Sequence, residues 1–344
     1  MKYGLIYSDK FELLNYGADH PFKKERFIKV KQYFQEKIPE IPILNPREYS
    51  IELLQKIHTK KYINLVKELS KKGKGYLSID TPVFPKIFEW ALTYTWASLT
   101  AAELVKERHY NILFNPCGGL HHAKRNTDGG FCVFNDVALA ATYLHDSGIE
   151  VVIVDIDAHA GDGTMQILYE KPILKINTHE DPTYLYPGTG FINQVGEGKG
   201  YGYTLNIPVP PGSTDDALIR IFDEIIVPAL KEIKPEIIIL QAGVDGYRRD
   251  PLTHLRYTTH GYHAISKKLK EITNRIIMLG GGGYSEEVHI LWATIFTTLI
   301  DRFEIIKQDA LKIDPQPTEC DEYLCKRIET IIQTILATHP LFKK

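Results

Sequence analysis

The sequence predicts an α/β protein with a mainly parallel sheet in a single domain. Short runs of β-branched and aliphatic residues alternate with longer amphipathic stretches, which is typical of strand–helix units. Polar segments that contain glycine follow several of these apolar runs, as they do at the carboxyl edge of such a sheet. A length of 344 residues would allow two domains. The informative residues are spread from end to end without a linker, however, so we expect one domain over residues 1–344.

The predicted elements follow from this alternation. We expect buried strands at 5–8, 111–114, 151–155, 173–178, 204–209, 237–241 and 275–279. We expect helices at 22–36, 50–70, 85–107, 135–147, 215–233, 261–273, 285–301 and 321–337. The polar segment 177–200 is too long for a plain connection, and loops of that length usually carry function.

The composition excludes several classes of protein. The 41 basic and 43 acidic residues give a net charge of -2, so we expect no direct binding of nucleic acid. The four cysteines are too few and too scattered for a disulfide framework, and they suit a reducing compartment. No apolar stretch is long enough for a signal peptide or a membrane span, so we expect a cytoplasmic protein without a membrane partner.

The most informative segment is VVIVDIDAHAGDG at 151–163, where an apolar run leads into Asp155, Asp157, His159 and Asp162. Alternate residues of an extended chain point the same way, so Asp157 and His159 can converge on one centre. Carboxylate and imidazole ligands suit a divalent transition metal, with zinc as the default. The alternative is that one of these residues caps a following helix. So many polar residues in so short a segment favour the metal.

The segment IIILQAGVDGYRRDPL at 237–252 repeats this arrangement, with Asp245 in the loop after a predicted strand. An aspartate of an Asx-turn is the alternative interpretation. With Asp157 and His159 it would give two carboxylates and one imidazole. Such a set leaves positions for water and substrate, as a catalytic zinc site requires.

Two adjacent histidines, His121 and His122, follow a glycine pair after another predicted strand. A single histidine is more often structural, but a tandem pair at a strand-end turn favours catalysis. A histidine acts as base or acid through one ring nitrogen when a carboxylate orients the other. Asp155 and Asp162 are available for that role.

Four glycines, Gly280–Gly283, precede Tyr284 after the strand predicted at 275–279. They extend neither to GK[ST] nor to GxGxxG, so a phosphate-binding or dinucleotide-binding loop is a weak interpretation. Glycines would instead let the backbone approach the site closely and direct Tyr284 into it. A phenol that is protonated at pH 7 can donate a hydrogen bond to a developing oxyanion.

Together these residues resemble the histone deacetylase family, including acetoin-utilisation proteins and acetylpolyamine amidohydrolases of bacteria and archaea. The resemblance rests on ordered motifs: HPFKKERF (20–27), HTKKYI (58–63), IDTPVF (79–84), GGLHHA (118–123), GGFCVFND (129–136), DIDAHAGDG (155–163), YPGTG (186–190), QAGVDGYRRDPL (241–252) and GGGGY (280–284). It implies a single zinc-dependent deacetylase domain. The sheet would be eight-stranded and related to that of arginases, with zinc at its carboxyl edge.

The resemblance also implies a role for each residue that matches a motif. The implied ligands of zinc, or of ferrous iron as the alternative, are Asp157, His159 and Asp245. The implied catalytic residues are His122 as general base and acid, His121 as its electrostatic neighbour, Asp162 and Asp155 as their carboxylate partners, and Tyr284 as the group that polarises the carbonyl.

The remaining implied residues bind substrate or a second ion. The substrate residues are Gly130, Phe131 and Tyr186 as channel walls, Leu252 at the rim, Asp80 as a rim acceptor for the substrate backbone, and Arg26 in an inner acetate pocket. Potassium is implied as a structural ion near the backbone of Asp155, Asp157 and His159, with Asn177 and Thr178 close by. The expected partner is an acetylated lysine side chain or another acetylated amine.

Three positions depart from the family pattern. Ala160 stands where a second histidine is usual, and Tyr186 stands where phenylalanine is common. Cys117 precedes the glycine pair without an assigned function, and a small buried thiol is the simplest interpretation. The function that we predict is removal of an acetyl or other short acyl group from a lysine-like amine. Deacetylation of an acetylpolyamine or of a small metabolite amide is the alternative, and a binuclear arginase-like hydrolase would need more metal ligands. A non-catalytic protein that binds acyl-lysine would lack a metal ligand, His122 or Tyr284, and none is lost.

Overall fold

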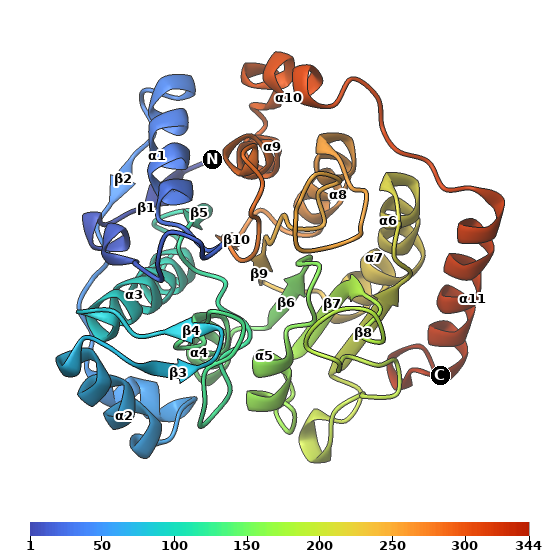
Figure 1. Cartoon of the computed structure of the whole chain (residues 1–344). Coiled ribbons are helices and arrows are strands. Elements are labelled where there is room, and N and C mark those ends of the chain that lie inside the picture. The colour runs from blue at the N-terminus through green and yellow to red at the C-terminus, as the bar shows by residue number, and fades with distance from the viewer. Residues whose placement is uncertain (344) are drawn as a thin grey trace.

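Eight parallel strands form one sheet in the computed structural model, which describes residues 1–343 (Figure 1). In sheet order they are β2 (Ile43–Leu44), β1 (Tyr3–Ile6), β5 (Ile112–Asn115), β10 (Ile276–Leu279), β9 (Ile237–Gln241), β6 (Val151–Asp155), β7 (Leu174–Glu180) and β8 (Thr204–Val209). A separate antiparallel hairpin joins β3 (Tyr76–Ser78) and β4 (Thr81–Pro82). The predicted fold class, an α/β domain with a mainly parallel eight-stranded sheet, is therefore confirmed.

Helices cover both faces of the sheet (Figure 1). They are α1 (Glu25–Lys37), α2 (Lys60–Lys72), α3 (Ile87–Lys106), α4 (Asp136–Asp146), α5 (Asp162–Ile167), α6 (Asp215–Ile221), α7 (Val227–Ile233), α8 (Thr259–Ile272), α9 (Val288–Leu299), α10 (Lys307–Ile313) and α11 (Glu322–Thr338). On one face α3 packs against β5 and β10, and α4 packs against β6. On the other face α9 packs against both α1 and α8.

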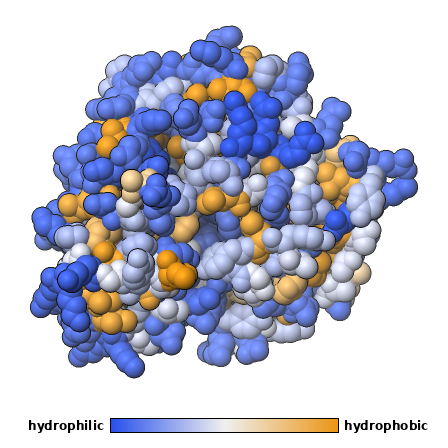
Figure 2. Space-filling model, in the orientation of Figure 1, coloured by the Kyte–Doolittle hydropathy of each residue, from blue (hydrophilic) through white to orange (hydrophobic). Residues whose placement is uncertain are grey.

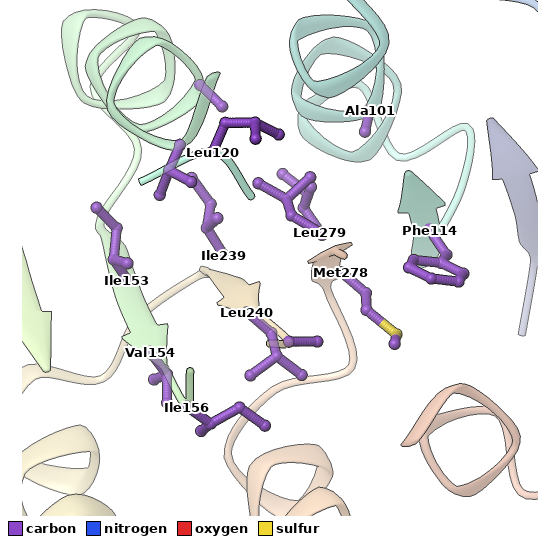
Figure 3. Close-up of a cluster of buried hydrophobic side chains, with 14 of the residues drawn as sticks. Ala101, Phe114, Leu120, Ile153, Val154, Ile156, Ile239, Leu240, Met278 and Leu279 are labelled. Atoms are coloured by element: carbon purple, nitrogen blue, oxygen red, sulfur yellow. The ribbon is translucent and has the colours of Figure 1, made fainter. Parts of the chain in front are cut away.

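The core forms because the central strands are apolar on both faces, as strands of a parallel sheet covered by two layers of helices must be. Figure 3 shows Ile153 and Ile239 on one face, while their neighbours Val154 and Leu240 point to the other. All four side chains are buried. This two-sided burial holds the strand ends in place, and the loops that follow them can therefore present polar residues in defined positions.

Two predicted helices are interrupted in the structure. The helix expected at 50–70 begins as a 3₁₀ turn, Ile51–Lys56, and α2 starts only after Thr59, whose hydroxyl accepts a hydrogen bond from the Tyr62 amide. The helix expected at 215–233 widens into a π turn at Phe222–Ile226 between α6 and α7. Pro228 directly after this turn has no N–H to donate, which favours such a wide turn.

Short elements and a cysteine pair also differ from the expectation. The edge strand β2, the β3–β4 hairpin, α5 and α10 were not predicted, and all of them are short. Cys320 and Cys325 form a disulfide where reduced cysteines were expected, because the start of α11 brings the two side chains together. Cys117 and Cys132 are buried and free.

The register of the sheet aligns the ends of four strands. Asp155 of β6 pairs with Gln241 of β9, which pairs with Leu279 of β10, which in turn pairs with Asn115 of β5. The loops that leave these four strands therefore start side by side at the carboxyl edge of the sheet. Ligands of open α/β sheets bind at this edge.

Candidate active site

Three potential metal ligands converge between the loops after β6 and β9. Ligand atoms of Asp157, His159 and Asp245 all lie within 4.8 Å of one another. One oxygen of each carboxylate is held by the protein. Oδ2 of Asp157 accepts hydrogen bonds from the Gly282 amide at 2.7 Å and from Gln241 Nε2 at 3.0 Å. Oδ1 of Asp245 accepts the Ala158 amide at 2.8 Å.

The other oxygen of each carboxylate faces the imidazole of His159. Nδ1 of His159 lies 2.8 Å from Asp245 Oδ2 and 3.3 Å from Asp157 Oδ1. Burial alone would lower the pKa of His159, but the charges of Asp245 and Asp157 raise it to about 10. Two buried carboxylates are stabilised by a positive charge placed between them. A divalent cation that binds oxygen and nitrogen ligands would supply this charge.

The tandem histidines lie beside this cluster, each with its own carboxylate. Nδ1 of His121 is 2.7 Å from Asp155 Oδ2, and Nδ1 of His122 is 2.8 Å from Asp162 Oδ1. The two Nε2 atoms are 3.1 Å apart. Both rings are buried, and the structure thus brings together the two pairs that the sequence suggested.

The two histidines differ in charge. Burial and, after it, the charge of the neighbouring His121 lower the pKa of His122 to about 4. Burial also acts to lower the pKa of His121, but Asp155 and Asp157 raise it to about 9. Near neutral pH, therefore, His121 carries the positive charge and His122 is neutral.

Tyr284 approaches the same site from the loop after β10. Its amide donates to Asp250 Oδ2 at 2.7 Å, and its ring packs edge-on against Phe131 at 6.0 Å. Burial, with Asp245 nearby, raises the pKa of the phenol well above its usual value. The hydroxyl is therefore protonated and can donate a hydrogen bond.

Phe131 and Tyr186, the residues predicted to form the channel walls, lie beside the rings of Tyr284 and His122. The Tyr186 ring lies 5.1 Å from the His122 ring and is 45% exposed. Phe131 adopts a positive φ of 69°, and its carbonyl accepts a hydrogen bond from the Tyr16 hydroxyl at 2.9 Å. A side chain on Gly130 would place its Cβ within 2.3 Å of the His122 ring, so glycine is needed there. Figure 2 shows a hollow near the centre of the face in view.

Asp80 lies in the turn of the β3–β4 hairpin, and its carboxylate binds the backbone next to Phe131. Its Oδ2 accepts the Gly130 amide at 3.1 Å, and its Oδ1 accepts the hydroxyls of Ser78 and Thr81. Leu252, at the rim, donates its amide to Asp250 Oδ1 at 3.0 Å. The role of Asp80 as an acceptor for substrate backbone stays a prediction, because its carboxylate already holds the channel wall.

Arg26 is a buried arginine without a carboxylate partner. Its side chain lies over the rings of Phe22 and Trp292, at 4.8 and 4.6 Å, and Nη2 donates to the Gly281 carbonyl. Its Nε and Nη1 atoms are buried and have no hydrogen-bond partner within residues 1–343. An anion that reached this point would find two free donors.

Some residues around the site were not assigned a role from the sequence. Gln241 holds Asp157, Lys124 lies 2.9 Å from Asp162 Oδ2, and Asp250 ties Tyr284 to Leu252. Gln241 could have been noticed in the sequence because it is the polar residue that ends the otherwise apolar run IIILQ. No motif in the sequence points to a role for Lys124 or Asp250, because sequence does not show which charged groups are paired.

Comparison with known proteins agrees with this arrangement. The family model for the histone deacetylase domain matches residues 20–299. A protein from Archaeoglobus fulgidus named "Probable deacetylase" is 35% identical over 298 residues, covering 83% of this chain and 82% of that protein. The acetoin utilization protein AcuC of Bacillus subtilis is 34% identical over 311 residues, covering 85% of this chain and 80% of its own.

A solved structure supports the fold separately. The HDA15 HD domain superposes with a TM-score of 0.86 at 23% identity, covering 99% of this chain and 97% of that one. The family model and the deacetylase relatives indicate a hydrolase of amide bonds. The chain belongs to the histone deacetylase family, whose members act on acetylated amines and are generally metal-dependent. Within residues 1–343, no helix is long and apolar enough to cross a membrane.

Proposed function

We propose that this deacetylase is zinc-dependent and removes acetyl or other short acyl groups from a lysine side chain. The observation that carries the proposal is that three metal ligands, a neutral histidine and a protonated phenol converge beside one aromatic entrance. An amide is a poor electrophile with a poor leaving group, so hydrolysis needs both an activated water and a stabilised oxyanion. Each group in the site has chemistry suited to one of these needs.

Asp157, His159 and Asp245 would hold the metal, with zinc preferred and ferrous iron as the alternative. When bound, such an ion polarises a carbonyl and lowers the pKa of water. Within residues 1–343, Asp245 Oδ2 has no backbone donor, whereas Asp157 Oδ1 accepts the His159 amide at 3.0 Å and keeps a further lone pair for the ion. The Gln241 and Gly282 donors fix the orientation of Asp157, as outer partners of metal ligands commonly do.

His122 would take the proton of the attacking water at Nε2 and return a proton to the departing amine. Asp162 holds the opposite nitrogen, Nδ1, and so fixes both the tautomer and the direction of the ring. His121 would stay protonated between Asp155 and His122 and act through its charge. Tyr284 would donate its hydroxyl hydrogen to the carbonyl oxygen as negative charge develops there.

Substrate would enter between Phe131 and Tyr186. Gly130 would line the channel next to His122, and Leu252 would lie at its rim. Two aromatic faces can hold four methylene groups without any polar contact. Arg26 would bind the product acetate through the donors that lack partners. Oδ2 of Asp80 accepts only the Gly130 amide, so it retains a lone pair for a donor on the substrate backbone.

A potassium ion near the backbone of Asp155, Asp157 and His159 belongs to the same proposal. The Asn177 amide bridges this segment, because its Nδ2 donates to the Asp155 carbonyl and its Oδ1 accepts the Gly161 amide. The buried Thr178 hydroxyl has no hydrogen-bond partner within the described chain. Asn177 and Thr178 are neighbours on β7, so their side chains point to opposite faces of the sheet. One of the two would therefore bind the ion through its backbone carbonyl.

The charges around the entrance favour acyl-lysine in a peptide over an acetylated polyamine. Arg248 pairs with Asp314, and Arg249 pairs with Glu287. The acidic groups are also engaged, because Glu180 binds His254 and Asp250 binds backbone amides. A polyamine keeps cationic amines outside the reaction centre and would need an uncompensated negative field there.

A fluorogenic acetyl-lysine peptide assay tests the proposal. A chelator should abolish turnover, and Zn²⁺ should restore it, with Fe²⁺ compared alongside. Asp245→Ala should stay folded but retain little metal by elemental analysis and little activity, whereas exposed Asp19→Ala should match the wild type. Full activity in metal-free protein would exclude the mechanism. In the same assay format, a preference above about tenfold for acetylated spermidine or putrescine, or ~1.4 kcal/mol in transition-state binding, would exclude peptide specificity.

A further inference from the structure

Lys175 is a buried lysine whose amine, within residues 1–343, binds only backbone carbonyls. The residue lies in β7 and is 5% exposed. Its Nζ donates to the Leu168 carbonyl at 2.8 Å and to the Ile173 carbonyl at 3.1 Å. Burial lowers the pKa of this amine to about 7, and no carboxylate counteracts the shift. Burying an amine without an acidic partner costs stability, so the contacts that it makes need an explanation.

The two carbonyls lie on either side of the turn that connects α5 to β7. Leu168 is the residue at which α5 ends, and Ile173 directly precedes β7. The helix α5 has only six residues, too few to be stable by itself. Its first residue is Asp162, the carboxylate that holds His122, and the Thr164 amide in its first turn donates to the His121 carbonyl at 2.9 Å. The Lys175 amine thus secures the end of α5 that is opposite to the histidines.

A small cavity is bordered by Lys175 and by the two aspartates whose carboxylates contact the histidines. Its volume is about 10 Å³, and Lys175, Asn177, Asp155 and Asp162 are among the residues that line it. This is close to the smallest space that admits one water molecule. Solvent therefore has little room to replace the amine at the two carbonyls while the lysine is in place.

We propose that Lys175 is a positioning residue for the deacetylase reaction. By holding the Leu168 and Ile173 carbonyls, its amine fixes α5 and with it the Asp162 carboxylate that orients His122. Both the ammonium and the neutral amine can donate to two carbonyls, so the contact does not depend on the protonation state. The inference rests on the proposed role of His122 as the base.

Two substitutions and a matched control test this role. Lys175→Ala removes the amine and opens a cavity, whereas Lys175→Met removes the amine and keeps most of the volume. Both should lower kcat by about tenfold, the lower end of the range for outer partners of active-site groups, with KM within about twofold of the wild type. Lys171→Ala alters a lysine of the same turn that donates to the Thr142 hydroxyl, and it should leave kcat unchanged.

Chemical rescue separates positioning from packing. Added n-propylammonium replaces the deleted part of the side chain, so it should restore kcat in Lys175→Ala but not in Lys175→Met, where the methionine fills the space. Propanol at the same concentration should not restore kcat, because it lacks the ammonium group. Wild-type kcat in either folded variant, or a loss in Lys175→Ala that propylammonium leaves unchanged, would overturn the proposal.

A spectroscopic measurement keeps this test independent of turnover. The Nδ1–H proton of His122 reports its hydrogen bond to Asp162 and can be observed by NMR in metal-loaded protein. We expect this resonance to shift or broaden in Lys175→Met and to stay unchanged in Lys171→Ala. An unchanged resonance in Lys175→Met would contradict the inference. A wild-type enzyme without amidase activity would instead contradict the proposed function and leave this measurement valid.

Discussion

His121 and His122 are neighbours with the same side chain, yet their surroundings assign them different chemistry. Asp155 and Asp157 raise the pKa of His121 to about 9 against the effect of burial. Burial and the charge of His121 lower the pKa of His122 to about 4. A general base must be neutral before it takes a proton, so only His122 has the right charge near pH 7.

The first prediction follows from this difference. His122→Ala should lower kcat by at least about 10²-fold, which is typical of a lost general acid–base group. His121→Ala should have a smaller effect, because His121 would act through its charge. Steady-state kinetics with a metal-loaded enzyme measures both, and the exposed His109→Ala provides a control. A larger loss in His121→Ala than in His122→Ala would reverse the assignment of roles.

Tyr284 provides a second prediction about a single atom. Tyr284→Phe keeps the ring that packs on Phe131 and removes one donor to the oxyanion. We expect kcat to fall by roughly 10²–10³-fold, as for other oxyanion donors, with little change in KM. Tyr323→Phe, at an exposed position on α11, is the matched control. A change confined to KM would mean that Tyr284 only lines the entrance.

At the scale of elements, the β3–β4 hairpin supports one wall of the entrance. Asp80 accepts the Gly130 amide, next to Phe131, and is itself held by Ser78 and Thr81. Phe131 needs this support because both Gly130 and Phe131 have positive φ, which is unfavourable for a residue with a bulky side chain. The hairpin therefore supports the proposed substrate entrance, although it lies outside the main sheet.

Asp80→Ala should raise KM more than it lowers kcat. If Asp80 mainly holds Gly130, the increase should be similar for an acetyl-lysine peptide and for free acetyl-lysine. If it mainly binds substrate backbone, the increase should be confined to the peptide. Comparing the two substrates distinguishes these roles, with Asp19→Ala as a surface control. An unchanged KM for both substrates would show that neither contact matters for binding.

At the scale of the whole molecule, buried neutral histidines limit stability in acid. His58 is buried, and its Nε2 accepts a hydrogen bond from the Asn135 amide at 3.0 Å, which requires an unprotonated nitrogen. Burial lowers its pKa from 6.5 to about 4. The unfolded chain therefore binds a proton below pH 6.5 that the folded chain does not bind, and stability must rise with pH in this range.

We expect the melting temperature to fall as the pH decreases from about 6.5 towards 4. The shift of His58 alone corresponds to roughly 3 kcal/mol, at about 1.4 kcal/mol per pKa unit. Calorimetry across this pH range measures the effect, and His58→Gln, which can still accept a hydrogen bond, should show a weaker dependence on pH. A melting temperature that stays constant or rises on acidification in the wild type would contradict this account.

Sequence patterns were most reliable where a local rule governs the structure. The central strands were predicted because apolar runs of that length are buried, and they lie close to the expected residues in the structure. The π turn at Phe222–Ile226 and the delayed start of α2 were missed. These features depend on which backbone groups find partners in space, and periodicity does not contain that information.

The sequence by itself determined the α/β class, the family, and the residue types that stand at each strand end. Only the tertiary structure decided which of them meet. The parallel register places the ends of β5, β10, β9 and β6 side by side, so residues more than 100 positions apart share one site. The tertiary structure also decided that the Asp80 carboxylate accepts the Gly130 amide and that the Lys175 amine binds two carbonyls. Such pairings depend on distance and burial, and a linear pattern records neither.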